Sequence, residues 1–144
     1  TAIGRAPLWV LVGVQGFRLP LELVLHAWGE AGVIPMSMTW EGQNLDVITG
    51  IAALMAAGVV ARGGLAVQRI TAGSFNLLGF GLLLNVARVA LLSSPVPMRI
   101  FGDPPLTLAL HFPTVWIVPF CVAGALFVHV VVFRRLWADF RGTG

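Results

Sequence analysis

The chain has 144 residues, of which 58% are hydrophobic and only 10% charged, with a formal net charge of +3. Soluble domains carry about 25% charged and about 45–50% apolar residues, and a soluble protein of this length could not bury so much apolar surface. The composition excludes an ordinary cytosolic enzyme, a disordered chain and, with Cys121 as the one cysteine, a disulfide scaffold.

The remaining class is an integral membrane protein with a single transmembrane domain over residues 1–144. About 20 apolar residues in a helix cross the hydrocarbon core of a bilayer. Four segments approach this length, at about residues 7–28, 45–61, 70–93 and 106–136. They lack the period-2 alternation of a membrane β-barrel. We therefore predict an all-α fold, a four-helix membrane bundle. Because Thr1 is not an initiator Met, we expect a stretch of chain before it.

The first segment carries three ionisable residues at a spacing of four, Arg18, Glu22 and His26. This spacing places them on one face of a helix. Pro20 lies among them, and a proline inside a helix removes a backbone hydrogen bond and presses on the carbonyl of the residue four positions earlier, here Gly16. We expect a kink beside the charged residues.

The second segment follows a connection, Met36 to Asn44, in which apolar and polar residues alternate. We expect that connection to form a short extended segment at the membrane interface. Asn44 is suited to cap the second helix, and Asp46 falls in its first turn, where the helix dipole favours an anion. A stripe of alanines follows at a spacing of four (Ala53, Ala57, Ala61), which predicts close helix packing, within the bundle or against another chain.

The third and fourth segments add further polar groups. Asn85 and Arg88 share a face of the third helix. In the fourth, Pro113 and Pro119 predict a second bent region. His111 is expected in the outer half of the bilayer, and His129 near the inner end of the fourth helix.

The arginines predict the orientation. Six of them flank the expected termini or the connection between the second and third helices, and one flanks the opposite side: the first group is Arg5, Arg62, Arg69, Arg134, Arg135 and Arg141, and the single one is Arg99. Cytoplasmic loops carry the excess of basic residues. We therefore expect both termini in the cytoplasm. The charges form no continuous stripe, so we expect no nucleic-acid partner.

This orientation brings the polar groups to similar depths. Ionisable residues inside a membrane are costly and face the bundle interior or another protein. We predict an outer-half cluster built on Arg18–Glu22 and Asp46–Arg88 pairs. Its other candidate members are Asn44, Asn85, His26 and His111. The cluster is interpreted as a structural clasp; the alternatives are a site for a ligand, ion or proton, and a contact with a partner subunit.

No motif indicates catalysis: the chain has no G-x-S-x-G, P-loop, C-x-x-C or H-E-x-x-H pattern, so we predict no catalytic residues and no enzyme. We expect no metal site and no cofactor. Haem held between His26 and His111, or a chlorin held by one imidazole, is the less favoured alternative, with His129 as a further candidate.

Two runs of residues resemble a family of uncharacterised small bacterial membrane proteins. They are Gly16-Phe17-Arg18 with Glu22, and Met38-Thr39-Trp40-Glu41-Gly42-Gln43-Asn44-Leu45-Asp46. Members carry an FR…E element followed by an MTFEGxNFD-like segment, and here Trp40 and Leu45 stand where Phe is more usual. The likeness extends over most of the chain. It implies a four-helix fold in a bacterial inner membrane and a role for Arg18, Glu22, Glu41, Asn44 and Asp46, and it implies no particular chemistry.

The function we expect is therefore that of a non-enzymatic, multi-pass protein of the inner membrane. Its partners would be the lipid bilayer and other membrane subunits, with the chain acting as an accessory or assembly subunit of a larger complex. The alternative is a membrane protein that binds a small ligand, an ion or proton, or a haem-like pigment at the polar cluster.

Overall fold

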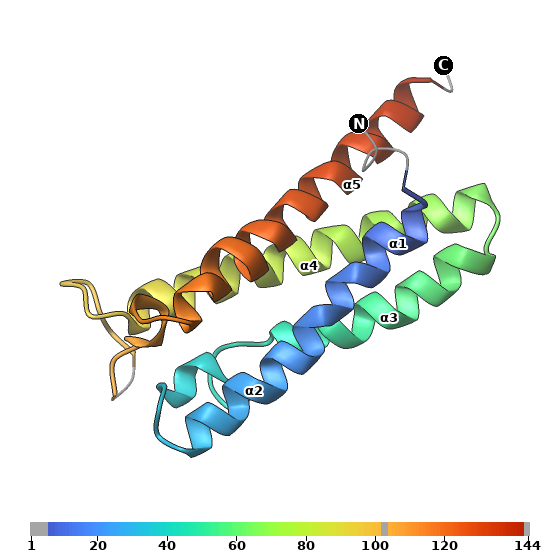
Figure 1. Cartoon of the computed structure of the whole chain (residues 1–144). Helices are drawn as coiled ribbons and strands as arrows, with labels where there is room; N and C mark the ends of the chain where they lie inside the picture. Colours follow the sequence, from blue (N-terminus) through green and yellow to red (C-terminus); the bar gives the residue numbers. More distant parts are fainter. Residues whose placement is uncertain (1–5, 102–103, 143–144) are drawn as a thin grey trace.

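The computed structural model describes residues 6–101 and 104–142, and helices account for its regular structure (Figure 1). The first segment consists of α1 (Leu8–Gly13), a 3-10 turn η2 (Val14–Phe17) and α2 (Arg18–Glu30). The next two are α3 (Asp46–Arg62) and α4 (Leu65–Ser93). The last combines a 3-10 turn η5 (Thr114–Trp116), a π-helix η6 (Ile117–Val122) and α5 (Ala123–Arg141). Two further 3-10 turns, η3 (Met36–Met38) and η4 (Leu108–Leu110), lie in the connections.

The four predicted helical segments are confirmed, with shifted boundaries. α4 begins at Leu65, five residues earlier than expected, because Gly63 and Gly64 alone form the connection from α3. The last segment begins at Thr114 rather than at residue 106, directly after Pro113, and it continues to Arg141 rather than ending at residue 136.

The prediction of an extended segment from Met36 to Asn44 is wrong. These residues form η3 and a series of turns, because the backbone bonds to itself: Gln43 N–H donates to the carbonyl of Ser37 at 3.0 Å. Gly42 makes this fold possible. A Cβ atom at that position would lie 2.2 Å from the carbonyl oxygen of Met36.

Both proline-bearing regions depart from the α-helix. Pro20 has no N–H to offer the carbonyl of Gly16, and that carbonyl lies in η2. The N–H groups at the end of η2 bond instead to the carbonyls of Gln15 and Gly16, in the tighter pattern of a 3-10 helix. Pro119 lies within the π-helix η6. Because proline has no backbone N–H, it cannot donate the hydrogen bond that an ordinary helical residue makes.

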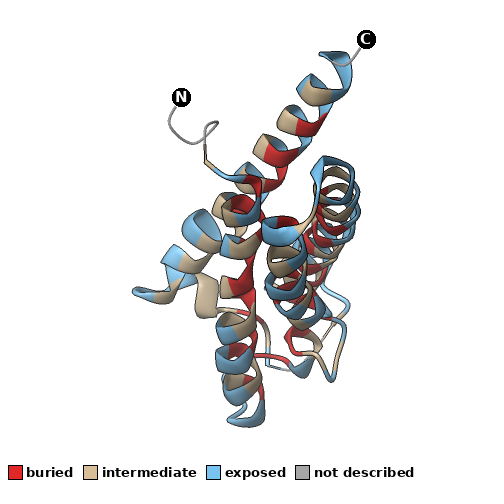
Figure 2. Ribbon diagram, turned by 90° about the vertical axis from the view of Figure 1, so that its right-hand side faces the viewer, coloured by how far each residue is buried: buried red, intermediate tan, exposed pale blue. Residues whose placement is uncertain are grey.

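The helical segments run antiparallel to their neighbours in sequence (Figure 1). The start of α1, the connection between α3 and α4, and the end of α5 lie at one end of the molecule; the two long connections lie at the other. Buried residues follow the inner faces of the helices (Figure 2). One apolar core lies near the end that holds the termini, formed by Leu8, Leu11, Val12, Ala53, Val60, Ala72, Phe75, Val132 and Leu136. A second lies near the long connections, formed by Leu25, Ile34, Met38, Val89 and Leu106.

The alanine stripe of α3 contributes to packing within the bundle. Ala53 is fully buried, and a Cβ atom on Gly13 of α1 would lie 3.2 Å from the Cβ of Ala57. Ala61, in contrast, is exposed. Small side chains at the first two positions therefore let α1 and α3 approach closely, as the spacing predicted.

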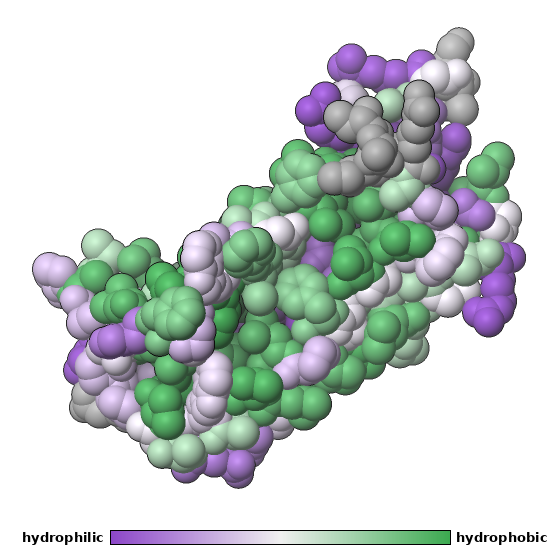
Figure 3. Space-filling model, in the orientation of Figure 1, coloured by the Kyte–Doolittle hydropathy of each residue, from purple (hydrophilic) through white to green (hydrophobic). Residues whose placement is uncertain are grey.

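The outer surface is apolar over much of its area. Three helical stretches are long and apolar enough to cross a membrane: Leu8–Glu30, Leu65–Ser93 and Thr114–Arg141. Large side chains such as Met55, Ile70, Leu77 and Phe120 are between 67% and 69% exposed. Hydrophobic residues cover the middle of the face in Figure 3, and hydrophilic ones gather towards the ends. A monomeric soluble protein rarely exposes so large an apolar surface.

Candidate functional site

Arg18, at the junction of η2 and α2, is the centre of a buried polar network. The residue is 1% exposed, although its side chain is among the largest in the interior. Its Nη1 donates to Asp46 Oδ1 of α3 at 2.7 Å and to the carbonyl of Gly79 of α4 at 3.2 Å. Its Nη2 lies 3.4 Å from Nε2 of His129 in α5. One guanidinium thus connects all four helical segments.

The network defines the proton position on His129. A guanidinium only donates hydrogen bonds, so Nε2 of His129 accepts from Arg18 and the ring proton is on Nδ1. That Nδ1 then donates to Oδ1 of Asn76 at 2.8 Å, and Nδ2 of Asn76 donates to the carbonyl of His129 at 3.1 Å. The imidazole is neutral in this arrangement, and both ring nitrogens are engaged.

Two glycines permit the close approach of the helices around Arg18. A Cβ atom on Gly79 would lie 2.8 Å from Cε1 of His129, and one on Gly50 would lie 2.5 Å from the backbone nitrogen of Leu19. Side chains at either position would push α4 away from α5, or α3 away from α2. The short distances from Arg18 to its partners depend on this packing.

Glu22, one turn after Arg18, belongs to a second part of the network. Its Oε1 accepts from Nδ2 of Asn44 at 2.7 Å, and the same amide donates to the carbonyl of Met38 at 3.1 Å. Oδ1 of Asn44 accepts from the N–H of Asp46, the first residue of α3, at 3.1 Å. The N-cap position of α3 is Leu45, so the prediction that Asn44 caps this helix is wrong by one residue, whereas Asp46 lies in the first turn as predicted. Glu22 is 1% exposed, and its Oε2 is a buried oxygen without a hydrogen-bond partner among the described residues.

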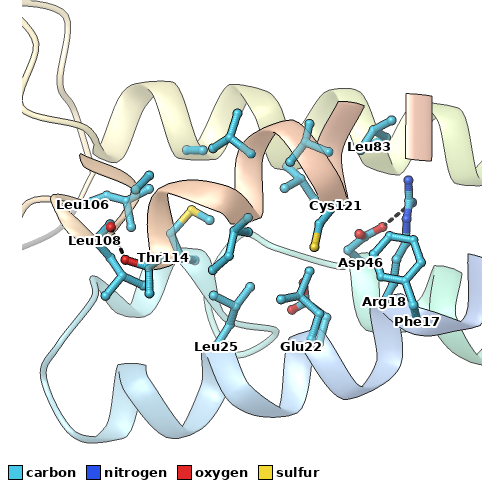
Figure 4. Close-up of a pocket in the computed structure, with 18 residues that line it drawn as sticks. Phe17, Arg18, Glu22, Leu25, Asp46, Leu83, Leu106, Leu108, Thr114 and Cys121 are labelled. Atoms are coloured by element: carbon cyan, nitrogen blue, oxygen red, sulfur yellow. Dashed lines mark hydrogen bonds and ion pairs between the residues drawn. The ribbon is translucent and has the colours of Figure 1, made fainter. Parts of the chain in front are cut away.

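Glu22 lines a cavity of about 90 Å³ between α2, α4, α3 and the segment that includes η4 and η6 (Figure 4). At one end lie Phe17, Arg18, Glu22 and Asp46, with the thiol of Cys121 nearby; the opposite end, near Leu106 and Leu108, is apolar apart from Thr114. Several residues of the wall, among them Leu21, Val118 and Val122, are partly or fully exposed. The cavity is therefore an apolar pocket, open to the surface, with carboxylates at its inner end.

The predicted pairing of charges is wrong. Arg18 pairs with Asp46 rather than with Glu22, because it points across the bundle to the start of α3. Arg88 cannot reach Asp46. It lies nine residues after Gly79, a rise of roughly 13 Å along α4, and is exposed.

The side chain of Arg88 has other partners near the long connections. Its Nη2 donates to Oδ1 of Asn85 at 2.9 Å, and its guanidinium lies 5.7 Å from the centre of the Phe101 ring. Asn85 in turn donates to the carbonyl of Gln43 at 2.7 Å. These two residues hold the connections and do not join the buried network.

His26 and His111 also lie outside the network. The ring of His26 stacks on Trp40 at 3.9 Å, and its Nε2 lies 3.8 Å from Glu30 and 4.0 Å from Glu41. His111 is exposed, with Nδ1 2.9 Å from the carbonyl of Thr107. Within residues 6–101 and 104–142, no group of three or more His, Cys, Asp or Glu side chains is placed to hold a metal ion.

Three polar members of the network were not predicted from the sequence: Gln15, Asn76 and His129. Gln15 donates to the carbonyl of Ala125 at 3.1 Å, and its position three residues before Arg18 was the available signal. Asn76 stands as a buried amide in a long apolar run. His129 lies mid-helix rather than near the inner end, because the last segment runs from Thr114 to Arg141.

Comparison with known proteins identifies the family of the chain. The model of a domain of unknown function (DUF8737) matches residues 4–137, so the chain belongs to this family. No curated protein and no solved structure matches the chain.

Proposed function

We propose that this is a multi-pass protein of a bacterial inner membrane that crosses the bilayer four times and binds a small amphiphilic ligand in the cavity at Glu22. Three segments have the length and apolar character of spans, and α3 packs among them. With 17 residues, α3 is about 26 Å long, which is close to the thickness of the hydrocarbon core. The bacterial assignment comes from the sequence resemblance.

The distribution of arginines supports a cytoplasmic location for both termini. Arg62, Arg69, Arg135 and Arg141 lie on the helix ends and connection that share one end of the molecule (Figure 1). Arg135 donates to the carbonyl of Ala6, so the start of the first segment and the last helix are joined there. An excess of basic residues is typical of the cytoplasmic side.

The observation that carries the ligand proposal is the buried, unpartnered Oε2 of Glu22, a residue that lines the cavity. A buried polar atom without a partner is costly, and natural structures almost always satisfy such atoms with protein, water or ligand. A ligand with a hydrogen-bond donor and an apolar chain would give Oε2 its missing partner and would fill the apolar part of the cavity.

The other part of the network supports the clasp interpretation. Arg18, Asp46, Asn76 and His129 bond to one another and hold four segments together. The network therefore has two roles in our proposal: the Arg18 side fixes the bundle, and the Glu22 side faces the ligand. A role as an accessory or assembly subunit stays a prediction, for which co-purification with other membrane proteins at fixed stoichiometry is the test.

Cys121 offers a direct assay, because it is the one cysteine of the chain and lines the cavity. In protein reconstituted into phosphatidylcholine vesicles, we expect short amphiphiles to slow its alkylation by N-ethylmaleimide in a saturable way. The matched control is the variant Cys121→Ser with Leu77→Cys, because Leu77 lies on α4 with 67% of its surface exposed. Alkylation of the cysteine introduced at position 77 should not slow when amphiphiles are added.

A cavity-filling variant tests the location. Ala90 lines the apolar part of the cavity, so Ala90→Leu should raise the amphiphile concentration needed for protection. Equal slowing at Cys121 and at the control cysteine, or no slowing by any amphiphile, would contradict the proposed function. The absorbance spectrum of the purified protein tests the pigment alternative, which predicts haem or chlorin bands.

A further inference from the structure

We propose that the ligand class is a single-chain amphiphile with a primary ammonium headgroup, held by Glu22, an inference that rests on the proposed function. The charges at the inner end of the cavity do not balance. Two carboxylates, Glu22 and Asp46, line it together with one guanidinium, that of Arg18. His129 is neutral in its hydrogen-bonded arrangement, so the protein supplies one carboxylate more than it supplies cations.

The guanidinium of Arg18 is already engaged. Arg18 forms its ion pair with Asp46 at 2.7 Å and is held further by Gly79 and His129. Among the described residues, no cationic side chain lies within ion-pair distance of Glu22. Its only hydrogen-bond donor there is the neutral amide of Asn44, on Oε1. The carboxyl group without an ion-pair partner is therefore also the one with an oxygen that accepts no hydrogen bond.

Headgroups of different charge would interact differently with this end of the cavity. An anionic headgroup would meet two carboxylates, and the guanidinium that could receive it is already paired. A hydroxyl would donate one bond to Oε2 but would not stabilise the ionised form of the carboxyl group. An ammonium group supplies both the donor and the opposite charge, and hydrogen bonds between ionised partners are the strongest of this kind. Away from the carboxylates the cavity is mainly apolar, which fits an alkyl chain and offers no site for a second charge.

Phosphatidylethanolamine also carries a primary ammonium group, but its phosphate would follow the ammonium into the apolar part of the cavity. Among the described residues that line this part of the cavity, such as Leu25, Leu106 and Leu108, none is cationic. A phosphate without a counter-charge in such surroundings is strongly disfavoured. We therefore assign the site to simple alkylamines rather than to this lipid.

The test compares decylamine, decanol and decanoate as protectants of Cys121 in phosphatidylcholine vesicles, at equal amounts bound to the bilayer. We expect decylamine to halve the alkylation rate at a load at least about tenfold lower than decanol, and decanoate to be the weakest. In the variant Glu22→Gln the advantage of the amine should disappear. The matched control Glu30→Gln removes an exposed carboxylate of the same helix and should preserve it.

The outcomes distinguish a failure of the amine assignment from a failure of the proposed function. Equal or better protection by decanol or decanoate in the wild-type protein would overturn the amine assignment and leave the proposed function intact, whereas protection by none of the three would end both. Ala90→Leu should weaken all amphiphiles and keep the amine-to-alcohol ratio, which tests the assignment even if Glu22→Gln fails to fold. Replacing phosphatidylcholine with phosphatidylethanolamine should leave the rate unchanged; protection by this lipid and not by decylamine would overturn the proposal.

Discussion

Removal of the buried ion pair gives a direct test of the network. Arg18→Met leaves the carboxylate of Asp46, whose side chain is 6% exposed, without its counter-charge. Breaking a buried pair by removing one partner costs about 3–5 kcal/mol, because the remaining charge is stranded. We expect that loss in the free energy of unfolding for Arg18→Met.

The double variant Arg18→Met with Asp46→Leu separates stranded charge from lost packing. Replacing both members of a buried pair by apolar residues is often close to neutral. Here the carbonyl of Gly79 and Nε2 of His129 also lose the guanidinium, a cost of about 1–3 kcal/mol. The double variant should therefore be more stable than Arg18→Met alone, although it carries the larger change.

The assay is unfolding in mixed micelles as sodium dodecyl sulfate is added, followed by the fluorescence of the five tryptophans. Arg134→Met is the control, because Arg134 is exposed near the end of α5, and its effect should stay within about 0.5 kcal/mol. If the double variant lost as much stability as the two single variants combined, the coupling between Arg18 and Asp46 would be absent and the reasoning refuted.

Gly79→Ala should destabilise the protein by about 1–3 kcal/mol, because its Cβ would lie 2.8 Å from His129, whereas Gly81→Ala on the same helix meets nothing within 4 Å and should be neutral or stabilising in the same unfolding assay. Asn44→Asp removes the amide donor to Glu22 and adds a third carboxylate, so the folded yield in detergent should fall, whereas Gln43→Glu in the exposed turn should not lower it. A fluorescent protein fused to the C-terminus should fold and emit in the cytoplasm, and a periplasmic phosphatase fused there should be inactive; the reverse result would contradict the orientation.

The sequence predicts the helices well and the contacts between them poorly. Apolar length and the punctuating residues determine four segments, and Asp46 lies in the first turn of α3 as predicted. The pairing of charges depends on how far each helix is displaced along its axis relative to its neighbours. Asp46 was assigned to Arg88 by depth alone, but an arginine side chain on the first segment lies closer to it.

The predicted boundaries of the last helical segment were also wrong. The last segment was expected to begin at residue 106 and to end at residue 136, whereas it runs from Thr114 to Arg141. The shift moves the centre of the helix towards His129 and brings this residue to the level of Arg18. Nothing in the residue types alone indicated that the chain from 104 to 113 would be irregular, apart from its three prolines.

The position of the network is best explained by Pro20. Because this residue cannot donate to the carbonyl of Gly16, the chain from Val14 to Phe17 takes up the 3-10 pattern. In a 3-10 helix, side chains three residues apart eclipse one another, so Gln15 and Arg18 point in the same direction. Both then reach the last segment, Gln15 at the carbonyl of Ala125 and Arg18 at His129 one turn further along. In a regular α-helix these two side chains would diverge by about 60°. A local defect in the first helix is therefore the feature that places the charged residues at the centre of the bundle.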